Sequence, residues 1–252
     1  MPIGLATPCR EIENTCRKAY LYKRCGLRPK HYIIPLDSGC GRTTLVRYMV
    51  YKYKEAGVLD FTCSPDDYIE ISFDGTMPQL KQAFSVIDSS AVYANEYSNI
   101  IGMDISGISF HLGEKQFTEF LKNCKRVCEH AVVIFFVHTT PSRNEERLIT
   151  KLCEAVDNIR LLEVESYTKE DICTLIIKTV AEHGIRIKHE NTFREALENM
   201  VSGLNFVSAK DAVAAAWKLI DAADFSGSAP TVDKGSLRFM NADQLTIQRG
   251  VK

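Results

Sequence analysis

The apolar residues of this chain fall into short runs that alternate with amphipathic stretches. The run 131–138 is almost continuously apolar, which is typical of a strand buried on both faces of a parallel sheet. The segment 68–73 instead alternates apolar and polar residues with a period of two, as a half-exposed strand does. The pattern as a whole predicts five strands, at 31–36, 68–73, 99–106, 131–138 and 159–164.

Helical periodicity separates most of these strands. Apolar residues recur at helical spacing in 9–25 and 114–129, 45–56 has the composition of a helix, and 77–89 can be helical after Pro78. Strands that alternate with helices predict a doubly wound α/β fold, a five-stranded parallel sheet with helices on both faces. After the fifth strand the strand pattern stops, and helices are expected at 168–183, 191–201 and 208–223. We therefore predict an N-terminal helix (1–28), an αβα core (29–166), an all-helical lid (167–223) and a tail without regular period (224–252).

Composition narrows the class of protein. The 252 residues are 45% hydrophobic and 25% charged with a net charge of −1, as in an ordinary globular protein. This balance does not indicate nucleic acid as a partner, and it does not exclude one either. The longest apolar run is too short for a membrane helix, and the first residues lack the features of a signal peptide. We expect no membrane association and a cytoplasmic location.

A glycine loop joins the first predicted strand to the helix after it. Against the pattern G-x-x-x-x-G-K-[ST], residues 36–43 keep Gly41 and Thr43 but carry Leu36 and Arg42 for the first Gly and the Lys. Gly39 is expected to supply the backbone freedom that Leu36 lacks. Loop N–H groups and a helix N-terminus together bind phosphate; an ordinary tight turn is the alternative. The predicted phosphate-binding residues are Asp37, Ser38, Gly39, Cys40, Gly41, Arg42, Thr43 and Thr44.

Two later predicted strands end in polar residues. Asp104 closes the third strand, and Thr139 and Thr140 follow the fourth. With the glycine loop, this order resembles the AAA+ ATPases, a family of P-loop NTPases, over roughly 29–223. The resemblance implies ATP and Mg²⁺ as ligands, with the oxygen atoms of Thr43 and Asp104 on the metal. It also implies that Thr139 or Thr140 contacts the γ-phosphate or orients water; strand-end turn chemistry is the alternative for both.

The resemblance also implies residues that act between subunits. Members of the family assemble into rings or filaments in which an Arg of one subunit reaches the nucleotide of its neighbour. Arg147 is our first choice for this role, ahead of Arg143 and Arg160. In the lid, Lys210 occupies the position of a basic residue that contacts nucleotide, although the family usually has Arg there. We therefore expect a homo-oligomer that also engages a protein partner.

The residue after Asp104 is Ile105, where the family has a carboxylate that polarises the attacking water. We therefore expect Mg-ATP to control oligomerisation or partner engagement, with slow or absent hydrolysis, and Ile105→Glu to raise turnover. One alternative is an active ATPase of the remodelling or loader type that uses Glu145 or Glu146 as its catalytic carboxylate. Another is an interaction scaffold whose nucleotide pocket has decayed.

Overall fold

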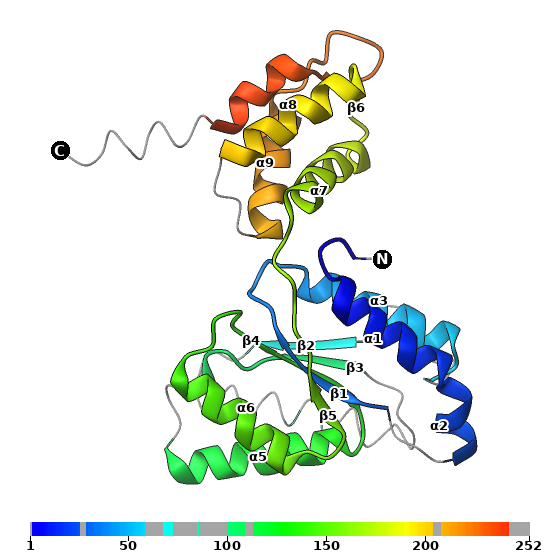
Figure 1. Cartoon of the computed structure of the whole chain (residues 1–252), viewed down its shortest axis with the longest axis vertical. Coiled ribbons are helices and arrows are strands. Elements are labelled where there is room, and N and C mark those ends of the chain that lie inside the picture. The colour runs from blue at the N-terminus through cyan, green and yellow to red at the C-terminus, as the bar shows by residue number, and fades with distance from the viewer. Residues whose placement is uncertain are drawn as a thin grey trace, which may run out of the picture. The chain divides into compact units, whose positions relative to one another are not determined.

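The computed structural model describes residues 2–25, 29–58, 68–72, 85, 100–108, 113–203 and 208–241. The chain divides into two compact units, Met1–Glu165 and Ser166–Lys252. Figure 1 shows both units, each with its own set of helices. Within the described residues, no helix combines the length and the apolar character needed to cross a lipid bilayer.

A five-stranded sheet forms the centre of the N-terminal unit. Its strands are β1 (His31–Pro35), β2 (Tyr68–Ser72), β3 (Ile100–Asp104), β4 (Val132–Val137) and β5 (Ile159–Leu161). Their order is β2-β3-β4-β1-β5, and every neighbouring pair is parallel. All six residues of β4 are buried, as its continuous apolar sequence predicts. The prediction of a five-stranded parallel sheet is confirmed.

Helices cover both faces of this sheet, as expected of a doubly wound fold (Figure 1). One face is covered by α3 (Arg42–Glu55), against which α1 (Ala6–Arg17) packs, and α2 (Ala19–Cys25) follows α1 along the chain. The other face is covered by α5 (Glu114–Cys128) and α6 (Arg143–Ala155). Side chains of β1, β3, β4, α5 and α6 form one continuous apolar core on that second face.

The helices of the N-terminal unit depart from the prediction in two places, and a third predicted helix lies almost wholly outside the described residues. The single helix expected over 9–25 begins earlier, at Ala6, and breaks at Lys18, whose N–H donates to the carbonyl of Thr15 at 3.0 Å. Helix α6 was not predicted, although Leu148 and Leu152 have the four-residue spacing of a buried helix face. The helix expected at 77–89 lies outside the described residues apart from Ser85.

The C-terminal unit contains the three predicted helices, α7 (Lys169–Glu182), α8 (Glu190–Gly203) and α9 (Ala209–Asp221). It also contains β6 (Arg186–Ile187), β7 (Thr231–Val232) and the 3₁₀ helix η2 (Lys234–Asn241). The three predicted helices are thus confirmed, and a short parallel pairing of β6 with β7 accompanies them. The prediction of an irregular tail is wrong for 224–241, since Val232, Leu237 and Met240 are buried in the core of this unit. Elements this short carry no periodic signal.

Candidate functional site

The glycine loop connects β1 to α3 in a conformation that requires glycine. Gly39 and Gly41 have φ values of 82° and 89°, in the left-handed region that side-chain-bearing residues rarely adopt. Leu36 is buried, and its N–H donates to the carbonyl of Val137 at 2.9 Å, so it prolongs the pairing of β1 with β4. Gly39 therefore supplies the freedom that Leu36 lacks, as expected.

Helix α3 begins at this loop. Its N-cap is Gly41, which has no side chain with which to cap the first turn. The N–H groups of a first helical turn have no acceptor within the helix, and the helix dipole places partial positive charge there. This end of α3 therefore presents backbone donors that suit an anion.

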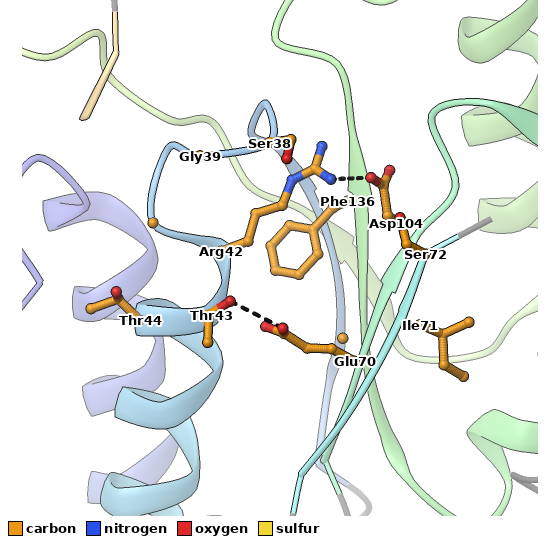
Figure 2. Close-up of a pocket in the computed structure, with 12 residues that line it drawn as sticks. Ser38, Gly39, Arg42, Thr43, Thr44, Glu70, Ile71, Ser72, Asp104 and Phe136 are labelled. Carbon is orange, nitrogen blue, oxygen red and sulfur yellow. Dashed lines mark hydrogen bonds and ion pairs between the residues drawn. The ribbon is translucent and has the colours of Figure 1, made fainter. Parts of the chain in front are cut away.

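A pocket of about 530 Å³ opens beside the loop. Figure 2 shows the loop and the first turn of α3 on one side of it and the strands of the sheet on the other. Its lining comes from the loop, α3, β2, β3 and β4, and consists of Ser38, Gly39, Gly41, Arg42, Thr43, Thr44, Glu70, Ile71, Ser72, Gly102, Asp104 and Phe136. Six of the eight residues predicted to bind phosphate are in this set. Of the other two, Cys40 is buried and Asp37 contacts the end of β4.

Arg42 is held by three groups at the mouth of this pocket. Its Nη1 forms an ion pair with Asp104, its Nε donates to the carbonyl of Leu36, and its guanidinium lies 5.3 Å from the centroid of the Phe136 ring. The second carboxylate oxygen of Asp104 accepts hydrogen bonds from Ser106, from the N–H at 3.1 Å and from Oγ at 2.7 Å. Both oxygens of Asp104 are therefore engaged by neighbouring side chains.

Thr43 contacts a carboxylate that the sequence analysis did not select. Its hydroxyl donates to Oε2 of Glu70 at 3.0 Å (Figure 2). Glu70 pairs in register with Gly102, as Ser72 does with Asp104, so these residues share the face of the sheet that lines the pocket. The period-two pattern of 68–73 could have placed Glu70 and Ser72 on one face, but only the pairing of β2 with β3 brings them to the loop.

The polar segment after β4 meets the glycine loop. Thr139 donates to Asp37 through its hydroxyl and through its N–H, the latter at 3.2 Å. The structure thus places Thr139 beside the predicted phosphate-binding loop. Thr140 is exposed. The roles of both as contacts for phosphate or water stay predictions.

Ile105 faces away from the pocket. Its side chain is completely buried in the apolar core with Met103 and Ile108, and its N–H continues the ladder to the carbonyl of Phe136 at 2.9 Å. Successive side chains of a strand point to opposite faces, so Asp104 and Ile105 cannot both reach the same ligand here. The expectation that Ile105→Glu would raise turnover does not fit this geometry, because the new carboxylate would enter the core.

The carboxylate of Glu145 is buried and hydrogen-bonded at the start of α6. It accepts hydrogen bonds from the Ser142 N–H at 2.9 Å and from Nδ1 of His138 at 2.7 Å. Burial raises the pKa of Glu145, but these hydrogen bonds outweigh it and leave the pKa below its ordinary value. Glu145 therefore caps the first turn of helix α6 and does not line the pocket. Glu146, the other proposed carboxylate, is exposed and also lies outside the pocket lining.

The predicted intersubunit residues lie on the surface. Arg143 and Arg147 are exposed on α6, whereas Arg160 forms an ion pair with Glu11 at 2.7 Å. Lys210 is exposed in the first turn of α9, within the C-terminal unit. The structure describes one chain, so the assignments of Arg147 and Lys210 stay predictions.

Comparison with known proteins gives structural matches only. No family model and no curated protein matches the sequence. The ADP form of ORC2 from Aeropyrum pernix superposes with a TM-score of 0.63 at 15% identity, over 92% of this chain and 67% of that one. RuvB of Thermotoga maritima gives 0.61 at 15% identity, over 96% and 70%. A katanin structure gives 0.61 at 13% identity, over 96% and 82%. Likeness at these identities shows the fold alone.

Proposed function

Because the chain has the fold of the AAA+ ATPases, we propose that it binds ATP with Mg²⁺ at the glycine loop. We further propose that bound nucleotide controls its self-assembly or its engagement of a protein partner, with little or no hydrolysis. The observation that carries the proposal is the loop itself. Its two left-handed glycines and the start of α3 open on a pocket that also holds a guanidinium and two carboxylates.

The metal that accompanies ATP requires oxygen ligands, and the pocket supplies them. Thr43, Glu70 and Asp104 contribute a hydroxyl and two carboxylates, which are the hard donors that Mg²⁺ prefers. These residues fit Mg²⁺, which when bound would neutralise charge on the phosphates. The chain's own contribution is to hold the loop donors and Arg42 at the same pocket.

Arg42 has an anionic partner in the pocket and can contact a bound phosphate as well. A phosphate offers the guanidinium a second anionic partner beside Asp104, and hydrogen bonds to charged groups are the stronger ones. The planar, forked guanidinium contacts the Leu36 carbonyl and Asp104 at once, which a lysine ammonium could not reproduce. The pocket is therefore suited to Arg, and the departure from the usual lysine does not by itself exclude phosphate binding.

The disposition of the carboxylates supports the proposal of weak hydrolysis. Among the residues that line the described pocket, the carboxylates are Glu70 and Asp104, and both are engaged, Glu70 by Thr43 and Asp104 by Arg42. Ile105 is buried in the core and Glu145 is held at the start of α6. A phosphoryl-transfer site needs an oriented water as well as charge neutralisation, and the candidates for orienting it are Thr139 and Thr140.

The test of ATP binding uses isothermal titration calorimetry with Mg²⁺ present. Arg42→Ala should weaken ATP binding by about 1.5–3 kcal/mol, the worth of a hydrogen bond to a charged group. Arg42→Lys should not improve on the original chain. Arg47→Ala is the matched control, since Arg47 lies on the same helix but contacts Tyr68 outside the pocket lining. If the original chain binds no ATP, the scaffold alternative replaces this proposal.

The test of assembly uses light scattering during the same titration. A nucleotide contacted by two subunits stabilises their interface, so the particle size should rise with ATP. The katanin structure that this fold matches is described in terms of self-assembly, which supports this part of the proposal. Arg147→Ala should reduce the ATP-dependent increase, whereas Lys151→Ala, a change at a half-buried position on the same helix, should not. Equal particle sizes with and without saturating ATP would contradict it.

A further inference from the structure

The two carboxylates of the pocket differ in their charge balance. Asp104 already has a cationic partner in Arg42, and the side chains of this pair are only 19% and 12% exposed. Glu70 accepts a hydrogen bond from the neutral hydroxyl of Thr43. Among the described residues, no Lys, Arg or His forms an ion pair with Glu70. The uncompensated negative charge of the pocket is therefore on β2.

We propose that Glu70, not Asp104, is the carboxylate that holds the divalent metal beside Thr43. This inference rests on the nucleotide-binding function proposed above and assigns the metal within that site. It places the metal carboxylate on β2, the edge strand, and leaves Asp104 as the partner that positions Arg42.

The chemistry of Thr43 supports this assignment. A hydroxyl has one proton to donate and lone pairs that can bind a cation. In this structure the proton is directed to Oε2 of Glu70 at 3.0 Å, which leaves the oxygen lone pairs of Thr43 and the second oxygen of Glu70 for a metal. Mg²⁺ commonly takes one or two protein oxygens and completes its shell with water and phosphate. Thr43 and Glu70 supply that number.

Gly102 in the neighbouring strand pairs with Glu70 and has little room for a side chain. A Cβ at Gly102 would lie 3.1 Å from Cγ2 of Val46, 3.3 Å from Cε2 of Phe136 and 3.6 Å from Cγ of Glu70. The first two distances are tighter than ordinary packing, so a side chain at position 102 would displace its neighbours. Gly102 thus lets β3 approach α3 closely while Glu70 reaches across to Thr43.

Electrostatics disfavour a metal at Asp104 in this arrangement. A divalent cation on the carboxylate of Asp104 would lie next to the guanidinium of Arg42, and like charges repel strongly where exposure is low. Figure 2 shows the Arg42–Asp104 pair and the Thr43–Glu70 pair as separate contacts, with the ring of Phe136 between them in this view. The cation therefore gains most at Glu70, with which no cationic side chain among the described residues forms an ion pair.

The test compares the affinity for ATP in Mg²⁺ with the affinity in EDTA, by calorimetry on the full chain. The original chain should bind ATP more tightly with Mg²⁺. Glu70→Gln keeps the shape of the side chain and removes its charge, so it should reduce this Mg²⁺ effect by about tenfold or more. Asp104→Asn should retain the effect. Glu114→Gln is the control, because it removes the charge of an exposed carboxylate on α5 that lies outside the pocket lining.

Two further measurements do not depend on a loss of ATP affinity. Glu70→Lys places a cation where the metal is expected, so ATP should bind it in EDTA more tightly than it binds the original chain in EDTA, with no further gain from Mg²⁺. Mn²⁺ added with ADP should be retained by the original chain and by Asp104→Asn, but not by Glu70→Gln, as followed by electron paramagnetic resonance. Thermal unfolding of each variant verifies that it is folded.

The outcomes separate this inference from the function on which it rests. Loss of the Mg²⁺ effect in Asp104→Asn, whether alone or together with Glu70→Gln, would overturn the assignment to Glu70 while ATP binding itself persists. An undiminished Mg²⁺ effect in Glu70→Gln would overturn it equally. Absence of ATP binding to the original chain in both buffers would overturn the proposed nucleotide function, and the metal assignment with it.

Discussion

Side-chain direction at the end of β3 determines which residues can act on a ligand. Asp104 faces the pocket and pairs with Arg42, whereas the next residue, Ile105, packs in the core formed with α5 and α6. The backbone of Ile105 still hydrogen-bonds to Phe136, so the strand alternation continues through this position. Adjacency in sequence here means opposite faces of the sheet.

Ile105→Glu should therefore destabilise the protein and should not raise ATP turnover. A carboxylate at a completely buried apolar position has no partner, and an uncompensated buried charge costs on the order of 3–5 kcal/mol. Urea unfolding followed by circular dichroism measures the loss. Ile105→Val is the control and should cost about 0.5–1.5 kcal/mol. A stable Ile105→Glu protein with faster hydrolysis would show that this residue turns toward the nucleotide.

At the scale of elements, Glu145 connects the start of α6 to the end of β4. Its carboxylate accepts from the N–H of Ser142, completing a capping box, and from the ring and N–H of His138, which follows β4. His138 precedes Thr139, which contacts Asp37 in the glycine loop. The carboxylate that could have served as a catalytic base thus holds the segment that approaches the loop.

Glu145→Gln should destabilise the fold by about 1–3 kcal/mol near neutral pH, because it weakens the charge-assisted hydrogen bonds that the buried carboxylate accepts. The pKa of Glu145 is lowered in the folded state, so its carboxylate stabilises the fold above its ordinary pKa, and this contribution is lost as the pH falls through the folded value. The difference in unfolding free energy between the two proteins should therefore shrink in acid.

Glu146→Gln is the matched control for this measurement, since the neighbouring side chain is exposed. It should change the unfolding free energy little at any pH. A stability difference between Glu145→Gln and the original chain that stayed constant down to strongly acidic pH would argue against the ionised carboxylate as the source of the stabilisation.

At the scale of the whole molecule, each unit has its own apolar core. The core of the C-terminal unit combines α7, α8 and α9 with Val232, Leu237 and Met240 from β7 and η2. These last residues follow the predicted lid and lie in the stretch expected to be an irregular tail. The C-terminal unit therefore includes 224–241 as part of its folded structure.

Leu237→Ala should destabilise the C-terminal unit by about 2–5 kcal/mol, because Leu237 is 2% exposed and its truncation leaves a cavity. Phe239→Ala, in the same 3₁₀ helix, removes a side chain that is 40% exposed and should cost much less. Hydrogen exchange followed by mass spectrometry should accelerate in 166–241 for Leu237→Ala, with 2–165 unchanged. Equal exchange in the two variants would contradict a core that includes η2.

The sequence by itself determined the class of the fold and the place of the loop. Continuous and alternating apolar patterns located all five strands of the sheet and the helices at 168–183, 191–201 and 208–223 within a few residues. The glycine loop could be located because the left-handed conformations of Gly39 and Gly41 are a local requirement that their residue type reveals.

Only the tertiary structure decided which side chains meet in the pocket. Glu70 reaches Thr43 because β2 pairs with β3, and Arg42 reaches Asp104 because α3 packs on that strand. The pairing of Arg186–Ile187 with Thr231–Val232 likewise joins segments far apart in the chain. Such contacts follow from strand pairing and packing between distant segments. Local periodicity cannot predict them, because it indicates only the face on which a residue lies and not its neighbour across the fold.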